Sequence, residues 1–187
     1  MKVFCITGMR GAGDAIDTFT SQGVPFEFRE VTANYSKPAR HGIKLAHAEA
    51  LAMDRMYGGG NIIVEDDVLL TAHHAIDVFL DAKVEAERLG YDILLGGVHH
   101  CNIVAETDNA MLRGINQVSG MHLYSVLTDR VDFMQCPMNE HIDNWIGRTY
   151  KVAVCWPIMA LQRAGWSEHH CKVVDYRTDF DRYPVLL

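Results

Sequence analysis

No apolar run in the 187-residue sequence approaches the ~20 residues that a helix needs to cross a bilayer. The N-terminal run VFCI, which follows a single lysine, is also too short for the apolar core of a secretory signal. Such a run is typical of a buried first strand. We therefore expect a protein that has no transmembrane segment and stays in the cytoplasm.

Cysteine is scarce and poorly arranged for cross-linking. The five cysteines are scattered, odd in number and contain no CxxC pair. This pattern argues against a disulfide framework and against a cysteine zinc site. We expect reduced thiols with structural roles.

Positive charge is in deficit, with 17 Lys and Arg against 24 Asp and Glu and a net charge of −7. Nonspecific binding to nucleic acid is disfavoured, because no basic stripe is available to neutralise phosphates. A nucleic acid acceptor remains possible but is not favoured, and a local basic pocket for one nucleotide is compatible with this charge. The ten histidines invite a metal-binding or proton-transfer role.

Linkers, repeats and low-complexity segments are missing too, so we expect a single domain over residues 1–187. Strands and helices alternate through the first half of the chain. The patterning predicts strands at 2–7, 25–31, 62–64 and 91–97, and helices at 14–22, 39–57 and 72–89. This order predicts an α/β fold with a mostly parallel, Rossmann-like sheet and helices on both faces.

The second half is less regular. We expect strands at 117–124 and 151–155 and helices at 126–134 and 140–148, with little periodicity in the tail.

Three adjacent carboxylates, Glu65, Asp66 and Asp67, follow the apolar strand at 62–64. In an open α/β sheet, ligands bind at the carboxyl ends of the strands. Adjacent carboxylates repel one another, and a divalent cation such as Mg²⁺ or Mn²⁺ removes that repulsion. If the segment is extended, Glu65 and Asp67 point the same way and Asp66 faces elsewhere.

The alternative for this triplet is a solvated acidic turn that caps the following helix. By itself the cluster indicates a metal and a diphosphate, with no indication of a sugar.

The segment IIVEDDV (62–68) resembles the signature strand of the family 25 glycosyltransferases, the lipooligosaccharide-biosynthesis and collagen galactosyltransferase group. HGIKLAH (41–47) resembles that family's glycine-to-Ser-His segment, with Gly42 and His47 in register and Ala46 in place of the usual Ser. Further similarities follow in the family's order at YDILLGG (91–97), SGMHLYSVLTDRVDF (119–133), HID (141–143) and WPIMALQRAGWSEHH (156–170), with matches at Gly120, Tyr124, Asp143, Pro157, Gln162 and Ser167.

This resemblance implies a GT-A type fold and an inverting transfer of a sugar from a nucleotide-diphosphate donor, expected to be a UDP-sugar, to a hydroxyl acceptor. It implies that Glu65 and Asp67 hold Mn²⁺ or Mg²⁺, with His169 or His170 completing the metal shell from the tail. The alternative for these two histidines is an ordinary structural role. Asp66 takes a supporting or ribose-facing role. Asp143 is the candidate base for the acceptor hydroxyl, and its alternative is a helix cap or surface charge.

The N-terminus departs from the family's Asn-Leu and basic stretch, because the first strand runs into Thr7, Gly8, Met9 and Arg10. We assign Thr7 and Arg10 to the nucleotide. His47 lies on the apolar face of its predicted helix, where it is either a hydrogen-bonded core residue or a group that supports the diphosphate or orients the metal carboxylates. His99 and His100 follow a strand end and either line the donor cleft or have an ordinary structural role.

Two other functions remain open. A metal-dependent phosphoryl-transfer or hydrolytic enzyme also needs clustered carboxylates at a strand end. A noncatalytic nucleotide-sugar-binding module would keep the fold without turnover. The acceptor is a carbohydrate or another hydroxyl-bearing molecule, and so short a chain would be a minimal member of the family, such as a virus might use on a nucleobase or a host component.

Overall fold

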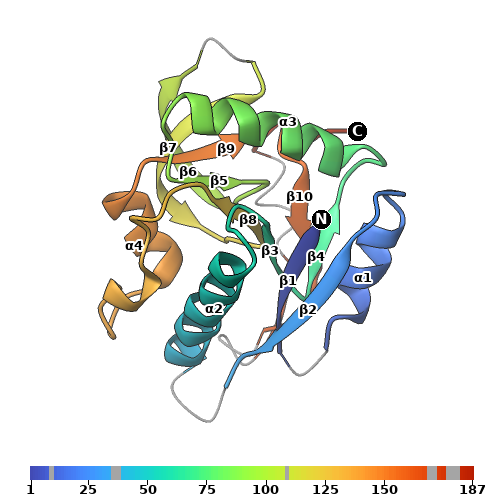
Figure 1. Ribbon diagram of the computed structural model, residues 1–187, viewed down its shortest axis with the longest axis vertical. Coiled ribbons are helices and arrows are strands. Elements are labelled where there is room, and N and C mark those ends of the chain that lie inside the picture. The colour runs from blue at the N-terminus through green and yellow to red at the C-terminus, as the bar shows by residue number, and fades with distance from the viewer. Residues whose placement is uncertain (9–10, 35–38, 108–109, 168–171, 176–181) are drawn as a thin grey trace.

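The computed structural model describes residues 1–8, 11–34, 39–107, 110–167, 172–175 and 182–187. In this part of the chain an eight-stranded sheet is covered by four α-helices, which confirms the predicted α/β class (Figure 1). The strand order is β2-β1-β3-β8-β5-β9-β7-β6.

The elements follow one another as β1 (Lys2–Thr7), α1 (Gly13–Thr20), β2 (Glu27–Thr32), α2 (Ala39–Met56), β3 (Ile62–Glu65), β4 (Val68–Leu70), α3 (Ala75–Arg88), β5 (Ile93–Leu95), β6 (His100–Glu106), β7 (Leu112–Ser119), β8 (Leu123–Val126), the short 3₁₀ helix η1 (Phe133–Gln135), α4 (Ile142–Thr149), β9 (Val152–Cys155), β10 (Ala160–Gln162), β11 (Gly165–Ser167) and β12 (Lys172–Val174).

The first 65 residues fold as their periodicity predicts. β1 pairs in parallel with β2 on one side and with β3 on the other. The crossover helices α1 and α2 lie within two residues of their predicted ends. Because the chain leaves β1 for one neighbour and then returns to the other, the direction of winding reverses at β1.

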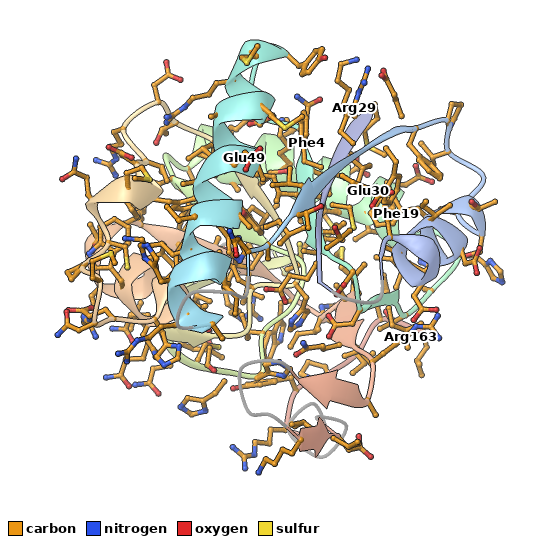
Figure 2. The ribbon with its side chains drawn as sticks, turned by 90° about the horizontal axis from the view of Figure 1, so that it is seen from below. Phe4, Phe19, Arg29, Glu30, Glu49 and Arg163 are labelled. Carbon is orange, nitrogen blue, oxygen red and sulfur yellow. The ribbon has the colours of Figure 1, made fainter. Side chains whose placement is uncertain are left out.

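The two faces of the sheet carry separate apolar clusters. Phe4 and Ile6 of β1 face the cluster that contains buried residues of α2 and α4, whereas Val3 and Cys5 face the cluster of α1 and α3. Figure 1 shows α2 and α4 toward the lower left of the sheet and α1 and α3 at its right and top. Figure 2 shows Phe4 beside α2 and Phe19 on α1, on opposite sides of the β1–β2 pair. The prediction of helices on both faces is confirmed.

The prediction of a mostly parallel sheet is wrong. Of the seven neighbouring pairs in the described sheet, four are antiparallel and three are parallel. The difference arises at β8, which inserts antiparallel between β3 and β5, and at β7, which also runs against its neighbours. A short strand that is buried throughout, as β8 is, carries no sequence signal for its direction.

Several local predictions are also corrected. Residues 68–70, for which the sequence predicts no helix or strand, form β4 and pair with β10 from the tail. The helix predicted at 126–134 is absent from these described residues, where a turn precedes η1. The strand predicted at 117–124 is two strands, β7 and β8, and β6 was missed. Within the described residues, no helix combines the length and apolar character needed to cross a membrane.

Candidate functional site

The acidic triplet lies where the ends of β1 and β3 meet. Glu65 is the last residue of β3, and Ile6 of β1 pairs with it in register. The N–H of Asp66 donates to the Ile6 carbonyl at 3.0 Å, and the N–H of Gly8 donates to Asp66 Oδ2 at 2.7 Å. The triplet therefore lies at the carboxyl edge of the sheet, beside the reversal at β1, which is the usual ligand position in open α/β sheets.

Glu65 is oriented by a buried histidine. His47 Nε2 of α2 lies 3.5 Å from Glu65 Oε1, and His47 Nδ1 lies 2.8 Å from the Tyr124 hydroxyl. The His47 side chain is 1% exposed and that of Glu65 is 25% exposed. His47 is therefore a hydrogen-bonded core residue and a neighbour of the acidic triplet at once, so the two interpretations of this residue are compatible.

The electrostatics keep Glu65 anionic. Burial acts to raise the pKa of Glu65, but the hydrogen bond and charge of His47 outweigh it and hold the pKa below its ordinary value. Burial also raises the pKa of the Tyr124 hydroxyl well above its usual range, and the nearby Glu65 charge adds to this. At neutral pH the site presents a carboxylate at Glu65 and a protonated phenol behind His47.

Asp67 belongs to a turn rather than to an extended strand. Residues 66–67 form a turn between β3 and β4, so the alternation argument for Glu65 and Asp67 does not apply. The Asp67 carbonyl accepts from the N–H of Arg163 at 2.8 Å, and Asp67 Oδ2 accepts from Gln162 Nε2 at 2.7 Å. Convergence of Glu65 and Asp67 on one cation stays a prediction.

Asp143 lies in the first turn of α4, next to the segment that joins β7 to β8. Its Oδ2 accepts from the N–H of Gly120 at 2.9 Å, and its Oδ1 accepts from the N–H of Asn144 at 3.1 Å. Gly120 has φ = +83°, and a Cβ on it would lie 2.2 Å from Cδ2 of His99. Asp143 is thus fixed against a glycine that itself packs on the His99 ring.

The imidazole rings of His99 and His122 lie between the acidic triplet and Asp143. The rings of His99 and His122 have centroids 4.8 Å apart, and the His122 carbonyl accepts from the N–H of Glu65 at 3.1 Å. Burial, aided by His99 and opposed by Glu65, lowers the pKa of His122 to about 3. His122 is therefore neutral at physiological pH. His99 Nε2 contacts Gln162 Oε1, which extends the network to Asp67.

The remaining predicted site residues divide into two groups. Thr7 is buried at the end of β1 and precedes Gly8, whose N–H binds Asp66, so Thr7 lies beside the triplet. Arg10 and the pair His169–His170 lie outside the described residues. The roles of all of these residues toward a nucleotide or a metal stay predictions.

The carboxylates suit a cation that is shared with a ligand. Within the described residues, no three His, Cys, Asp or Glu side chains are grouped so that they could hold a metal ion. Hard oxygen donors nevertheless fit Mg²⁺ or Mn²⁺, and Mg²⁺ is commonly bound by one or two carboxylates together with substrate phosphates and water. Glu65 and Asp67 fit that arrangement better than they fit a closed protein cage.

A solved structure has a similar fold. The chain shares its fold with A197 from STIV. The alignment covers 93% of this chain and 93% of A197, with a TM-score of 0.53 and 13% sequence identity. At this identity the likeness to A197 concerns the fold alone. No family model matches the sequence, and neither does any curated protein.

A cleft lies near the other end of β3. This cleft of about 210 Å³ is lined by residues that include Asp54, Arg55, Lys83 and glycines 58–60. Its charged groups stabilise loops, because Asp54 accepts from the N–H groups of Gly60 and Asn61 and Arg55 donates to backbone carbonyls at residues 129 and 131. This cleft lies beside glycines 58–60, which precede β3, whereas the triplet lies at the end of β3.

Sequence reasoning missed the part of the network that depends on distant pairing. His122 was not singled out, and Gln162 was noted only as a family match. The available signal was weak, since His122 is a lone histidine before a strand and Gln162 is a polar residue in an irregular tail. The β10–β4 pairing, which brings Gln162 beside Asp67, joins segments about 95 residues apart.

Proposed function

We propose that this protein is a metal-dependent glycosyltransferase that moves a sugar, with inversion, from a nucleotide-diphosphate donor to a hydroxyl acceptor. One observation carries the proposal. Three acidic residues lie at the carboxyl edge of the sheet beside the reversal at β1, and each carboxylate is held by a different partner, His47, Gly8 or Gln162. A plain acidic turn does not require three separate supports. The reason for proposing sugar transfer is the ordered resemblance to the family 25 enzymes, which implies a GT-A type fold.

In this proposal the residues of the chain divide the chemistry between them. Glu65 and Asp67 bind the divalent ion, which, when bound, acts as a Lewis acid on the departing diphosphate. His47 keeps the Glu65 carboxylate oriented and anionic. The oxygen of the acceptor hydroxyl bonds to the anomeric carbon as the bond from that carbon to the diphosphate breaks. Asp143 accepts the proton that this hydroxyl loses.

Helix α4 supports the proposed base geometrically. Asp143 has one oxygen bound by Gly120 and the other bound by the N–H of Asn144. Such bonds fix the carboxylate direction, and a general base has to be held within hydrogen-bond reach of the proton that it takes.

A thermal-shift panel of UDP-sugars and other nucleotide sugars, each with and without Mn²⁺, tests the proposal. Binding to the native state raises the melting temperature by mass action. We expect one donor to stabilise the protein only with Mn²⁺, and the Asp67→Ala variant to lose this stabilisation. Stabilisation by phosphate esters and by no sugar nucleotide would instead indicate a phosphoryl-transfer or hydrolytic enzyme.

Turnover separates the transferase from a noncatalytic module. The contrary outcome is a protein that binds a donor and releases no UDP, even when sugar acceptors are supplied at high concentration. That result would indicate a binding module that keeps the same site.

A further inference from the structure

The side chain of Gln162 joins Asp67 to His99. Gln162 Nε2 donates to Asp67 Oδ2 at 2.7 Å, and its Oε1 contacts His99 Nε2. Gln162 ends β10 and pairs in register with Val68, the residue after Asp67. The backbone ladder and the side-chain contact therefore hold the same turn from the same strand.

The chemistry of the two ends fixes which way the amide points. A carboxylate only accepts hydrogen bonds, so the amide NH₂ of Gln162 has to face Asp67. Its carbonyl oxygen then faces His99 and requires a proton on His99 Nε2. No flipped amide satisfies both neighbours, so this bridge has a single hydrogen-bonded arrangement.

His99 is itself anchored at its far side. The backbone N–H of His99 donates to the Ser119 carbonyl at 2.8 Å. The His99 ring packs directly on Gly120, whose backbone N–H donates to Asp143. His99 is only 8% exposed. A continuous set of contacts therefore runs from Asp67 through Gln162, His99 and Gly120 to Asp143.

We propose that Gln162 is a positioning residue that orients the Asp67 carboxylate toward the divalent ion that it would bind together with Glu65. This inference rests on the proposed function. Fixing one oxygen of Asp67 against the amide fixes the direction of the other oxygen. The same contacts set the position of Asp67 relative to Asp143, so that the metal-binding edge and the base belong to one rigid unit.

The test measures Mn²⁺ binding rather than turnover. The free Mn²⁺ signal is followed by electron paramagnetic resonance as MnCl₂ is titrated into protein saturated with UDP. Replacing groups that orient metal ligands commonly weakens metal affinity by about 10–100-fold. We expect Gln162→Met and Gln162→Leu, each of which removes both hydrogen bonds of the amide, to raise the Kd for Mn²⁺ roughly tenfold.

Gln135→Met is the matched control. Gln135 also donates from Nε2 to an aspartate, Asp132 Oδ2, at 3.2 Å, but it is exposed on η1, away from the triplet. This variant should leave the Kd unchanged. Urea unfolding of each variant separates a local effect from a loss of folding, and Gln162→Leu provides a second apolar variant if Gln162→Met is unstable.

The outcomes distinguish the two proposals. Wild-type binding of Mn²⁺ with UDP, weakened in both Gln162 variants, supports the positioning role. Wild-type affinity in folded Gln162 variants overturns the positioning role and leaves the proposed function intact. If wild-type protein itself binds no Mn²⁺ in the presence of UDP, the proposed function is wrong and the positioning role is wrong with it.

Discussion

The Asp66 carboxylate accepts a 2.7 Å hydrogen bond from the backbone N–H of Gly8, a residue 58 positions earlier in the chain. The N–H of Asp66 in turn donates to the Ile6 carbonyl at 3.0 Å. The two bonds connect the end of β1 to the turn after β3. Asp66 is thus part of the architecture of this edge, whatever it contributes to a bound nucleotide.

Replacing Asp66 with alanine should loosen this edge. Loss of the carboxylate leaves the N–H of Gly8 without its acceptor, and we expect unfolding to become easier by about 1–3 kcal/mol. Asp66→Asn keeps an acceptor oxygen and should recover most of that loss. Urea denaturation measures both, with Asp81→Ala, an exposed position on α3, as the control. Equal stability of Asp66→Ala and Asp81→Ala would contradict the role.

Gly120 should tolerate no side chain. Its φ of +83° costs an alanine about 1–2 kcal/mol. The Cβ would also lie 2.2 Å from the His99 ring, and such overpacking adds about 1–3 kcal/mol. Gly90→Ala separates the two effects, because Gly90 has φ = +69° and no atom within 4 Å of a Cβ. Thermal unfolding should therefore show a clearly larger loss for Gly120→Ala, and equal losses would exclude the packing against His99.

Asp92 should make stability depend on pH in the acid range. Burial acts to raise the pKa of this fully buried carboxyl, but hydrogen bonds from Arg130, the Lys151 N–H and Thr128 outweigh it and lower the pKa. Because the folded pKa lies below the unfolded one, this stabilisation is complete above the unfolded pKa, about 3.9, and is lost as the pH falls through the folded pKa.

Asp92→Asn should therefore cost about 2–3 kcal/mol at neutral pH. The difference in free energy of unfolding between wild type and Asp92→Asn should stay constant down to about pH 4 and shrink below that pH. Urea unfolding between pH 2 and 7 measures it. A difference that grows on acidification would contradict the assigned direction of the pKa shift.

Asp143→Asn tests the proposed base. Asparagine keeps an oxygen for the Gly120 N–H but cannot accept a proton at neutral pH, so sugar transfer should fall by about 10²–10⁴-fold. Binding of Mn²⁺ and UDP should remain unchanged, because the proposed metal ligands are untouched. The assay is UDP release in the presence of the variant and of wild type. Undiminished release would assign Asp143 a purely structural role as the support of Gly120.

The sequence predicted the elements well where one helix face or one buried strand determined the pattern. The helices α1, α2 and α4 and the strands around the triplet lie close to their expected bounds, because each has a clear apolar pattern, and glycines follow α1 and α2. The direction of β8 was not predictable, since this strand is buried on both faces and its apolar pattern does not depend on its direction.

The sequence predicted several individual residues of the candidate site, but it did not predict the contacts that connect them. The acidic triplet is visible as a local sequence feature, and His47 is placed by helical spacing. The contacts of Gln162 and His122 depend on strand pairing between segments far apart in the sequence, which local patterning does not encode. Even the triplet was misjudged in geometry, because the alternation expected of a strand ends at Glu65, where the chain turns.

The most direct test of the central claim is UDP release from a panel of UDP-sugars, measured with Mn²⁺ and with chelator, in wild type and in Asp67→Ala. The account predicts that at least one UDP-sugar loses its sugar to an acceptor or to water only when Mn²⁺ is present, and that Asp67→Ala abolishes this release. Cleavage of phosphate esters without any sugar transfer, or metal-independent release that persists in Asp67→Ala, would contradict it.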